Sequence, residues 1–341
     1  MSAAATSFTV DGSLYWRRPL CQMRWDLDCA LDACASAVQH AGGPIALLAG
    51  HGAALGTYMR VFSGTGEALS AWEWHYGRVR MLHWTAATEI ACVLESGRVM
   101  LWSLHGTCTA SFALFDAGDE QTVLRCEAFE EGAVFITSAL RPCVLQSFAS
   151  KKVLALAEPH LTSPPTAMTV LKSSSSSASL SATAGGAGGG AKWACPEVVL
   201  ATASRTVLVV DDKGAHDQLL TSGPFVHLAV SPNGKFIAAF SADGALQVLS
   251  SDFSRHLSQI DTRSTTPPRA LVWCGVDAIL LLVRNLPESA ALRRLLSPSL
   301  AFARLRSPSL AFARLLSPCS PSLTFARLFS PSLRSGDALE A

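Results

Sequence analysis

Two turn dipeptides, Asn233-Gly234 and Asp243-Gly244, lie ten residues apart in the most regular stretch of the chain, residues 223–282. Asn-Gly and Asp-Gly tolerate the positive φ angles of a tight hairpin turn, so each predicts a strand–turn–strand unit. Lys235–Phe240 is long enough for the strand between them, and Ala245–Ser250 makes the next strand. The apolar residues are largely β-branched or aromatic, as a half-buried antiparallel sheet prefers. This stretch is therefore predicted to form one blade-like meander.

The same pattern recurs upstream, where short strand-like segments alternate with glycine-containing turns from Thr57 onward. Ile90–Leu94 and Val99–Ser103 flank one such turn, and Val123–Phe129 and Ala133–Thr137 flank another. Short strands at spacings of about ten residues indicate a sandwich or a propeller. At roughly 40–45 residues per blade, the β-rich region would hold about five or six blades. The expected fold class is all-β, an incomplete WD40-like β-propeller with a low-complexity C-terminal tail.

The segments AVSPNGKF, SSDFS and LVWCG within residues 223–275 resemble the N-terminal domain of the vacuolar protein sorting-associated protein 16 family. The resemblance also covers Tyr15-Trp16-Arg17, Met23–Asp26 and Gly42–Leu48. It implies a propeller that belongs to a subunit of the class C tethering complexes, HOPS and CORVET. Because the resemblance stops after Val283, we expect the chain to be truncated relative to the family. The family's α-solenoid, which binds the Sec1/Munc18-like subunit, would then be absent.

The chain divides by composition into a folded part and a tail. Residues 12–283 are expected to form the propeller, with a flexible Ser/Gly insertion at 173–190. Residues 284–341 contain Ser-Pro and Phe-Ala-Arg repeats, and we expect this tail to be disordered because regularly spaced prolines prevent a continuous helix. Residues 1–11 are expected to be a frayed start, and 27–39 a short helix or a loop.

Composition limits the classes of partner. Hydrophobic residues make up 49% of the chain and charged residues 16%, which favours a sizeable core, and the formal net charge is only +1. Outside the arginine-containing tail there is no basic stripe, so nucleic acid is not an expected partner. No apolar run reaches about 18 residues, so any membrane association is expected to be indirect. The ten cysteines contain no Cys-x-x-Cys pair, which favours reduced thiols in the cytoplasm.

No motif predicts a catalytic residue, a cofactor site or a metal site. Gly50–Gly56 is followed by a strand-like segment rather than the helix that a phosphate loop requires. His75 and His83 stand apart from any zinc-like spacing. Glu130-Glu131 and Asp211-Asp212 fall at turns, where solvation explains them without acid–base chemistry.

The favoured function is that of a non-catalytic scaffold, with other class C tethering subunits as partners. The resemblance implies a cytoplasmic protein, peripheral on endosome and lysosome or vacuole membranes, that acts in vesicle tethering and fusion. The alternatives are a generic WD-type adaptor, a propeller enzyme or a non-functional truncated fragment. An enzyme would bring polar groups together at the propeller axis. Trp72 and Trp74 share one face of a predicted strand and are expected to pack between blades rather than to form a ligand cage.

Overall fold

The computed structural model of this 341-residue chain describes residues between 6 and 316, with gaps. The described ranges are 6–10, 13–17, 34–39, 42–49, 57–171, 195–262, 266–276, 278–282, 300–304 and 312–316. Within them the strands form one two-stranded hairpin and six four-stranded antiparallel sheets. The predicted all-β class and the predicted number of blades are therefore confirmed.

The hairpin contains β1 (Thr6–Val10) and β2 (Ser13–Arg17). Sheet 1 contains β3 (Cys34–Val38), β4 (Ile45–Ala49), β5 (Tyr58–Phe62) and β6 (Ala68–Glu73), and sheet 2 contains β7 (Val79–Trp84), β8 (Ile90–Leu94), β9 (Arg98–Trp102) and β10 (Cys108–Ala113). Sheet 3 contains β11 (Val123–Ala128), β12 (Ala133–Thr137), β13 (Pro142–Leu145) and β14 (Val153–Ala155), and sheet 4 contains β15 (Ala167–Leu171), β16 (Glu197–Ala201), β17 (Val207–Val210) and β18 (Ala215–Asp217). Sheet 5 contains β19 (Phe225–Val230), β20 (Phe236–Ser241), β21 (Ala245–Ser250) and β22 (His256–Asp261), and sheet 6 contains β23 (Ala270–Cys274), β24 (Ala278–Leu282), β25 (Leu300–Arg304) and β26 (Phe312–Leu316).

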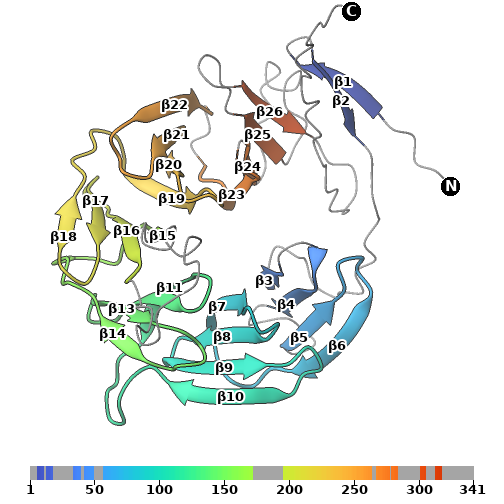
Figure 1. The fold of residues 1–341 in the computed structure, drawn as a ribbon, viewed down its shortest axis with the longest axis vertical. Coiled ribbons are helices and arrows are strands. Elements are labelled where there is room, and N and C mark those ends of the chain that lie inside the picture. The colour runs from blue at the N-terminus through green and yellow to red at the C-terminus, as the bar shows by residue number, and fades with distance from the viewer. Residues whose placement is uncertain are drawn as a thin grey trace, which may run out of the picture.

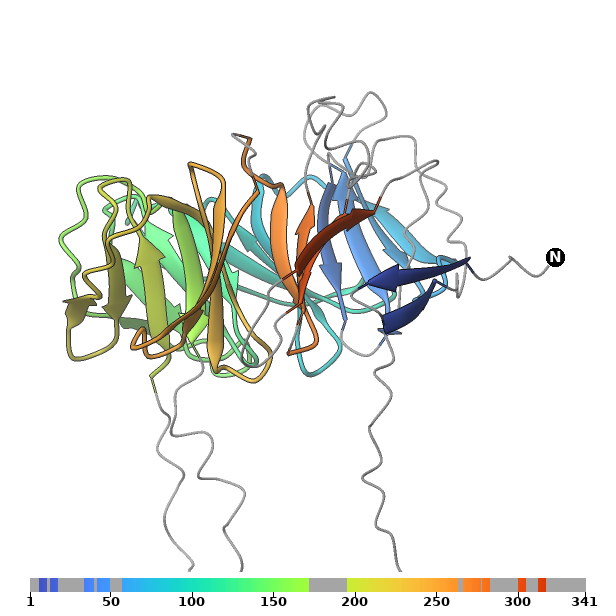
Figure 2. The same cartoon turned by 90° about the horizontal axis from the view of Figure 1, so that it is seen from above.

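The six sheets follow one another around a common axis (Figure 1). Within each sheet the strands run in chain order from the axis to the periphery, and the first strands of successive sheets pack side by side from β3 to β23. Seen from above, the sheets stand around a disc with their strands crossing its thickness (Figure 2). This is the blade arrangement of a β-propeller. The β1–β2 hairpin lies at the rim, beside the interval between sheet 6 and sheet 1 (Figure 1).

Apolar cores lie between consecutive sheets, and a single strand such as β16 can contribute to two of them. In β16, Val198 packs toward sheet 3 and Val199 packs toward sheet 5, and both are fully buried. A strand that is buried on both faces needs a continuous apolar run instead of alternation. The second strands of sheets 2 and 3 have this character too, at Ile90–Leu94 and Ala133–Thr137. Burial between sheets therefore determines the sequence pattern of these strands.

The hairpin turns follow the prediction and add a feature that it did not include. Gly234 and Gly244 have φ angles of 70° and 93°, and they close the β19–β20 and β20–β21 turns as predicted. The Ser241 hydroxyl accepts a hydrogen bond from the Ala245 amide at 3.1 Å. Thr202 accepts one from the amide four residues later in the same way, at 3.2 Å. A hydroxyl at the first turn position thus satisfies a backbone donor that the sheet leaves unpaired.

Two local predictions near the N-terminus were wrong. Residues 6–10 are strand β1, not part of a frayed start, because their backbone pairs with β2 in register. Residues 34–38 are strand β3, not a helix or a loop. The small side chains of β3 suit an innermost strand, where the sheets converge on the axis. The Trp84 indole of sheet 2 donates a hydrogen bond to the Ala37 carbonyl at 3.1 Å, which fixes β3 against its neighbour.

The Ser/Gly insertion at 173–190 lies outside the described residues. In the repeat tail, β25 and β26 extend sheet 6 by antiparallel pairing, β25 with β24 and β26 with β25. β25 is the LAFAR end of the first ten-residue copy, whereas β26 (FARLL) begins two residues later in the repeat and runs into the third copy. The boundary placed at residue 283 stays a prediction.

Leu246 and Leu257 provide a matched test of packing between the sheets. Leu246 of β21 is 1% exposed and belongs to the core between sheets 5 and 6, whereas Leu257 of the outer strand β22 is 45% exposed. Leu246→Ala should lower the free energy of unfolding by about 2–5 kcal/mol, because a cavity remains after the side chain is removed. Leu257→Ala should change it by less than about 0.5 kcal/mol. Urea unfolding followed by circular dichroism measures both, and equal losses would contradict the assigned core.

Candidate functional site

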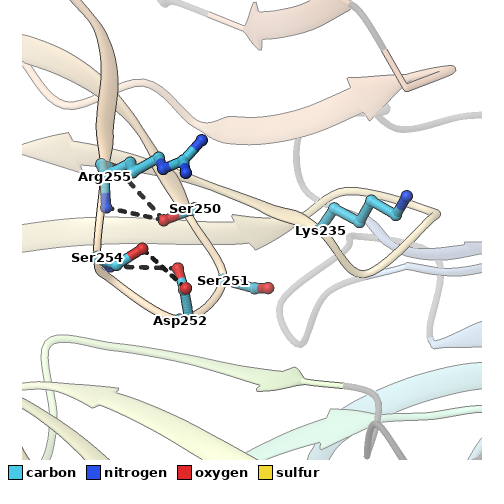
Figure 3. A pocket seen from close by; sticks show the side chains of 6 residues that line it. All are labelled: Lys235, Ser250, Ser251, Asp252, Ser254 and Arg255. Atoms are coloured by element: carbon cyan, nitrogen blue, oxygen red, sulfur yellow. Dashed lines mark hydrogen bonds between the residues drawn. The ribbon is translucent and has the colours of Figure 1, made fainter.

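A polar depression of about 280 Å³ opens between two turns of sheet 5 (Figure 3). It is lined by Lys235, Ser250, Ser251, Asp252, Ser254 and Arg255. The Ser251 amide donates a hydrogen bond to the Lys235 carbonyl at 2.9 Å, which joins the β19–β20 turn to the β21–β22 turn. The Arg255 amide donates to the Ser250 hydroxyl at 3.0 Å, and the Ser254 hydroxyl donates to the Asp252 carboxylate at 2.8 Å. The turns are therefore held together by their own hydrogen bonds.

The charges in this depression do not converge. Hydrogen bonds from the hydroxyls of Ser250 and Ser254 lower the pKa of Asp252 to about 2, so its carboxylate is ionised at neutral pH and offsets one of the two cations. The charged ends of Lys235 and Arg255 lie apart in the close view (Figure 3). A phosphate site needs donors aimed at a common point. The depression is therefore a mixed-charge recess of the surface, without the geometry of a cofactor site.

The propeller axis carries a second group of ionisable residues. Arg125 and Glu127 lie on β11, opposite Ile136 and Val134 of β12, and therefore on one face of sheet 3. Burial raises the pKa of Glu127 to about 7, while the charge of Arg125 acts in the opposite direction. Burial lowers the pKa of His227 on β19, and the positive charge of Arg125 adds to this effect. The axis thus holds single groups of both signs, brought together from strands far apart in the sequence.

The described residues contain no group of three or more His, Cys, Asp or Glu side chains that could hold a metal ion. His75 lies 2.8 Å from the Glu73 carboxylate on the surface, and the His83 ring stacks on Phe148 with centroids 6.5 Å apart. The Asp211 carboxylate accepts hydrogen bonds from two backbone amides of its own turn. In the same part of the chain, no helix has the length and apolar character needed to cross a membrane. Gly50–Gly56 lies outside the described residues.

An aromatic cluster joins sheet 1 to sheet 2. The Trp72 and Trp102 rings stack with centroids 5.2 Å apart, and the Trp74 ring lies 6.1 Å from that of Trp102. The Trp74 indole donates a hydrogen bond to the Gly77 carbonyl at 2.8 Å. Tyr76 covers the outer side of the cluster, with its ring 5.4 Å from Trp102. The expectation that Trp72 and Trp74 pack between blades is confirmed.

Exposed valines mark the two ends of the ring. Val38 of β3 is 53% exposed, and Val272 of β23 is 48% exposed. Val276, in the turn after β23, is 47% exposed. These residues belong to the first strands and first turn of the two sheets that flank the interval in the ring. No pattern in the sequence marks these valines as exposed, because a valine in a strand is normally interpreted as a core residue.

Comparison with known families identifies the fold family. The family model described as Vps16, N-terminal region, matches residues 4–286. The chain belongs to this family. The family was predicted from the segments in residues 223–275 and from the N-terminal motifs, and the match confirms it.

Named relatives share this region. The chain is 24% identical to the vacuolar protein sorting-associated protein 16 homolog of Dictyostelium discoideum over 80% of its length, and 26% identical to the protein VACUOLELESS1 of Arabidopsis thaliana over 78%. The matched part is about a third of each relative, at 32% and 33% of their lengths. Among solved structures, BamB from Moraxella catarrhalis aligns with a TM-score of 0.45 at 9% identity, covering 83% of this chain and 76% of that one.

The raised pKa of Glu127 predicts that the stability of the folded chain depends on pH. Burial raises this pKa to about 7 in the folded chain from the ordinary value of 4.5, so the folded state binds the proton more tightly. The contribution of Glu127 to the free energy of unfolding therefore falls as pH rises through this interval and is constant above it. The stability that Glu127→Gln gains relative to the unmodified chain should grow from about pH 4.5 to about pH 7 and stay constant above it. Because Glu127 is an exposed residue, solvent screens this effect and the gain is smaller than full burial would give.

Thermal unfolding of both proteins at several pH values measures this gain, and a carbon NMR titration of the carboxyl measures the pKa directly. A difference in stability that does not change with pH would contradict the assignment.

Substitution of Gly106 tests how tightly the aromatic cluster is packed, because this glycine lies against the Trp72 ring. A Cβ atom at Gly106 would lie 2.8 Å from the Trp72 ring, whereas one at Gly118 meets nothing within 4 Å, and both glycines have positive φ angles. Each alanine substitution should cost about 1–3 kcal/mol of backbone strain. Gly106→Ala should cost about 1–3 kcal/mol more because it displaces the ring. Urea unfolding of the two variants measures the difference, and equal costs would show that the ring is free to move.

Proposed function

We propose that the chain is a non-catalytic β-propeller scaffold, the N-terminal part of a subunit of HOPS- and CORVET-type tethering complexes. The observation that carries the proposal is the family match over residues 4–286, which spans sheets 1–5 and the first two strands of sheet 6. The relatives named for vacuolar protein sorting support a role in that process. On this proposal the protein acts in vesicle tethering and membrane fusion at the endosome and the lysosome or vacuole.

The physical character of the fold supports scaffolding. Sheets 2–5 are packed on both faces, so their loops are held on a rigid ring. A rigid ring presents many loops on two broad faces without a large entropic cost of ordering them. At the axis, Arg125, Glu127 and His227 supply one group each and do not form a pair of carboxylates or a set of metal ligands. Acid–base catalysis would require such groups within reach of one reacting atom.

The proposed partners are the other class C tethering subunits, through protein–protein contacts. Membrane association would then come through those partners, and the protein would be peripheral on endosome and lysosome or vacuole membranes. The family's Sec1/Munc18-like subunit binds the α-solenoid, which lies outside the third of the relatives' length that this chain matches. Its binding is therefore not assigned to this chain.

Affinity capture of the tagged chain from its own cells, followed by mass spectrometry, tests the proposal. The other class C tethering subunits should be recovered with the unmodified chain and with Leu257→Asp, whose site is at the rim. Leu246→Asp should lose them, because an unpaired carboxylate in the core between sheets 5 and 6 prevents folding.

Recovery of chaperones alone with the unmodified chain would favour a non-functional fragment. Recovery of unrelated proteins in place of these subunits would favour a generic adaptor. Equal recovery of the subunits with Leu246→Asp would show that the folded propeller is not the binding element. Each of these three results would contradict the proposal.

A further inference from the structure

The Asn233-Gly234 turn between β19 and β20 has a chemical reactivity that the proposed function does not use. The main-chain nitrogen of the residue after an asparagine can attack the side-chain Cγ atom, and glycine obstructs this attack least because it has no Cβ. The chain contains two asparagines, and the other one, Asn285, is followed by Leu286. Asn233 is exposed, so water reaches it. Of the two asparagines, Asn233 therefore has the more reactive neighbour.

The turn that contains Asn233 is restrained by three hydrogen bonds. The Gly234 amide donates to the Ser231 carbonyl at 2.8 Å, which closes the turn. The Asn233 Oδ1 atom accepts a hydrogen bond from the Ser231 hydroxyl at 2.7 Å and another from the Lys235 amide at 3.1 Å. The attacking nitrogen and the carboxamide group are thus both engaged in the closed turn. The reaction therefore requires the turn to open.

Ser231 connects this turn to the buried part of sheet 5. The residue is 2% exposed, and its hydroxyl also accepts a hydrogen bond from the Phe236 amide at 2.9 Å. One hydroxyl therefore holds both the carboxamide of Asn233 and the first amide of β20. Opening of the turn breaks these hydrogen bonds together, so the Ser231 side chain is expected to restrain the opening.

The next turn of the same sheet shows that an aspartate fits this geometry. In the β20–β21 turn, the Ser241 hydroxyl donates to the Asp243 carboxylate, and the Gly244 amide donates to the Ser241 carbonyl at 3.1 Å. Residues 241–244 thus repeat the arrangement of residues 231–234, with aspartate in place of asparagine. Conversion of Asn233 into aspartate would therefore keep the turn intact.

We propose that Asn233 is a site of spontaneous deamidation, and that opening of the β19–β20 turn, restrained by Ser231, controls its rate. The Gly234 nitrogen loses its proton to a solvent base and forms a bond to the Asn233 Cγ atom. The Cγ–Nδ2 bond breaks, and the leaving nitrogen takes up a proton from solvent and departs as ammonia. Water then hydrolyses the resulting cyclic imide: cleavage of the bond to Cγ gives aspartate, and cleavage of the bond to the main-chain carbonyl gives isoaspartate. This inference goes beyond the proposed function, because it needs no partner protein.

The two products have different effects on sheet 5. Aspartate adds a negative charge close to Lys235, which lines the polar depression (Figure 3). Isoaspartate inserts a methylene group into the main chain, so the amides of Gly234 and Lys235 lose their positions relative to Ser231. The Lys235 carbonyl accepts the hydrogen bond from the Ser251 amide that joins the two turns of the depression. Aspartate therefore changes the charge of this surface, whereas isoaspartate loosens it.

The test follows deamidation of the full 341-residue chain in mildly alkaline buffer, either folded or unfolded in guanidinium chloride. Peptide mapping by mass spectrometry measures the conversion of Asn233 and Asn285, and chromatography separates the aspartate and isoaspartate peptides. In the unfolded chain, Asn233 should react faster than Asn285. Folding should slow the reaction at Asn233 by about tenfold, because only the open turn reacts.

Ser231→Ala should raise the rate at Asn233 in the folded chain by about threefold to tenfold, because the hydroxyl that holds the carboxamide is lost. It should leave the rate in the unfolded chain unchanged. Ser103→Ala is the matched control, since it removes a turn hydroxyl that accepts a backbone amide in sheet 2, and it should change neither rate. Circular dichroism checks that both variants fold, and the comparison of the folded and unfolded chain needs no variant.

Three results would overturn the proposal. The first is deamidation of the folded chain at Asn285 and not at Asn233. The second is an equal rate at Asn233 in the folded and the unfolded chain, which would show that the turn does not control the reaction. The third is a folded Ser231→Ala variant that deamidates no faster than Ser103→Ala.

Discussion

The contact between the face of one sheet and the face of the next is the interaction on which this structure depends. Five apolar cores, each shared by two consecutive sheets, connect sheets 1 to 6 in the described residues. Every sheet between the two ends is stabilised from both sides, so the ring behaves as a chain of nearest-neighbour contacts. Sheets 1 and 6 each belong to only one of these cores. The far faces of the two end sheets therefore lie outside these five cores.

Local chemistry allowed most of this fold to be predicted. The Asn233-Gly234 and Asp243-Gly244 dipeptides located two hairpins, because glycine adopts the positive φ angles of Gly234 and Gly244 without steric cost. The strand predicted at Ala245–Ser250 has the same bounds in the structure. Burial on both faces also explains why strands such as Ile90–Leu94 were readable as continuous apolar runs. Turn residues and the apolar runs of strands buried on both faces are local patterns of a few residues, so both can be recognised in a single sequence.

The features that were missed depend on contacts between distant segments. Cys34–Val38 resembles a helix or a loop because its small residues have no strand preference, and only its place at the axis makes them suitable. The turn hydroxyls of Thr202 and Ser241 are ordinary loop residues in the sequence. Arg125 and His227 come from different sheets, so their electrostatic interaction requires the ring. The exposure of Val272 was also unpredictable, since this residue differs from a core valine only in what lies beside it.

Leu257 and Val272 show why the end faces differ from the rest of the surface. They are 45% and 48% exposed, yet Leu257 belongs to the outer strand of a sheet that is packed on both faces. A partner at the rim meets scattered apolar side chains between polar ones, which is normal for a soluble protein. Val272 belongs to a sheet that has one face in the described cores, and Leu280 and Leu282 on its other face are partly exposed as well. Because sheets 2–5 are packed on both faces and sheet 6 belongs to one core, the exposure of Val272 follows from the place of its sheet in the row and not from the character of its own strand.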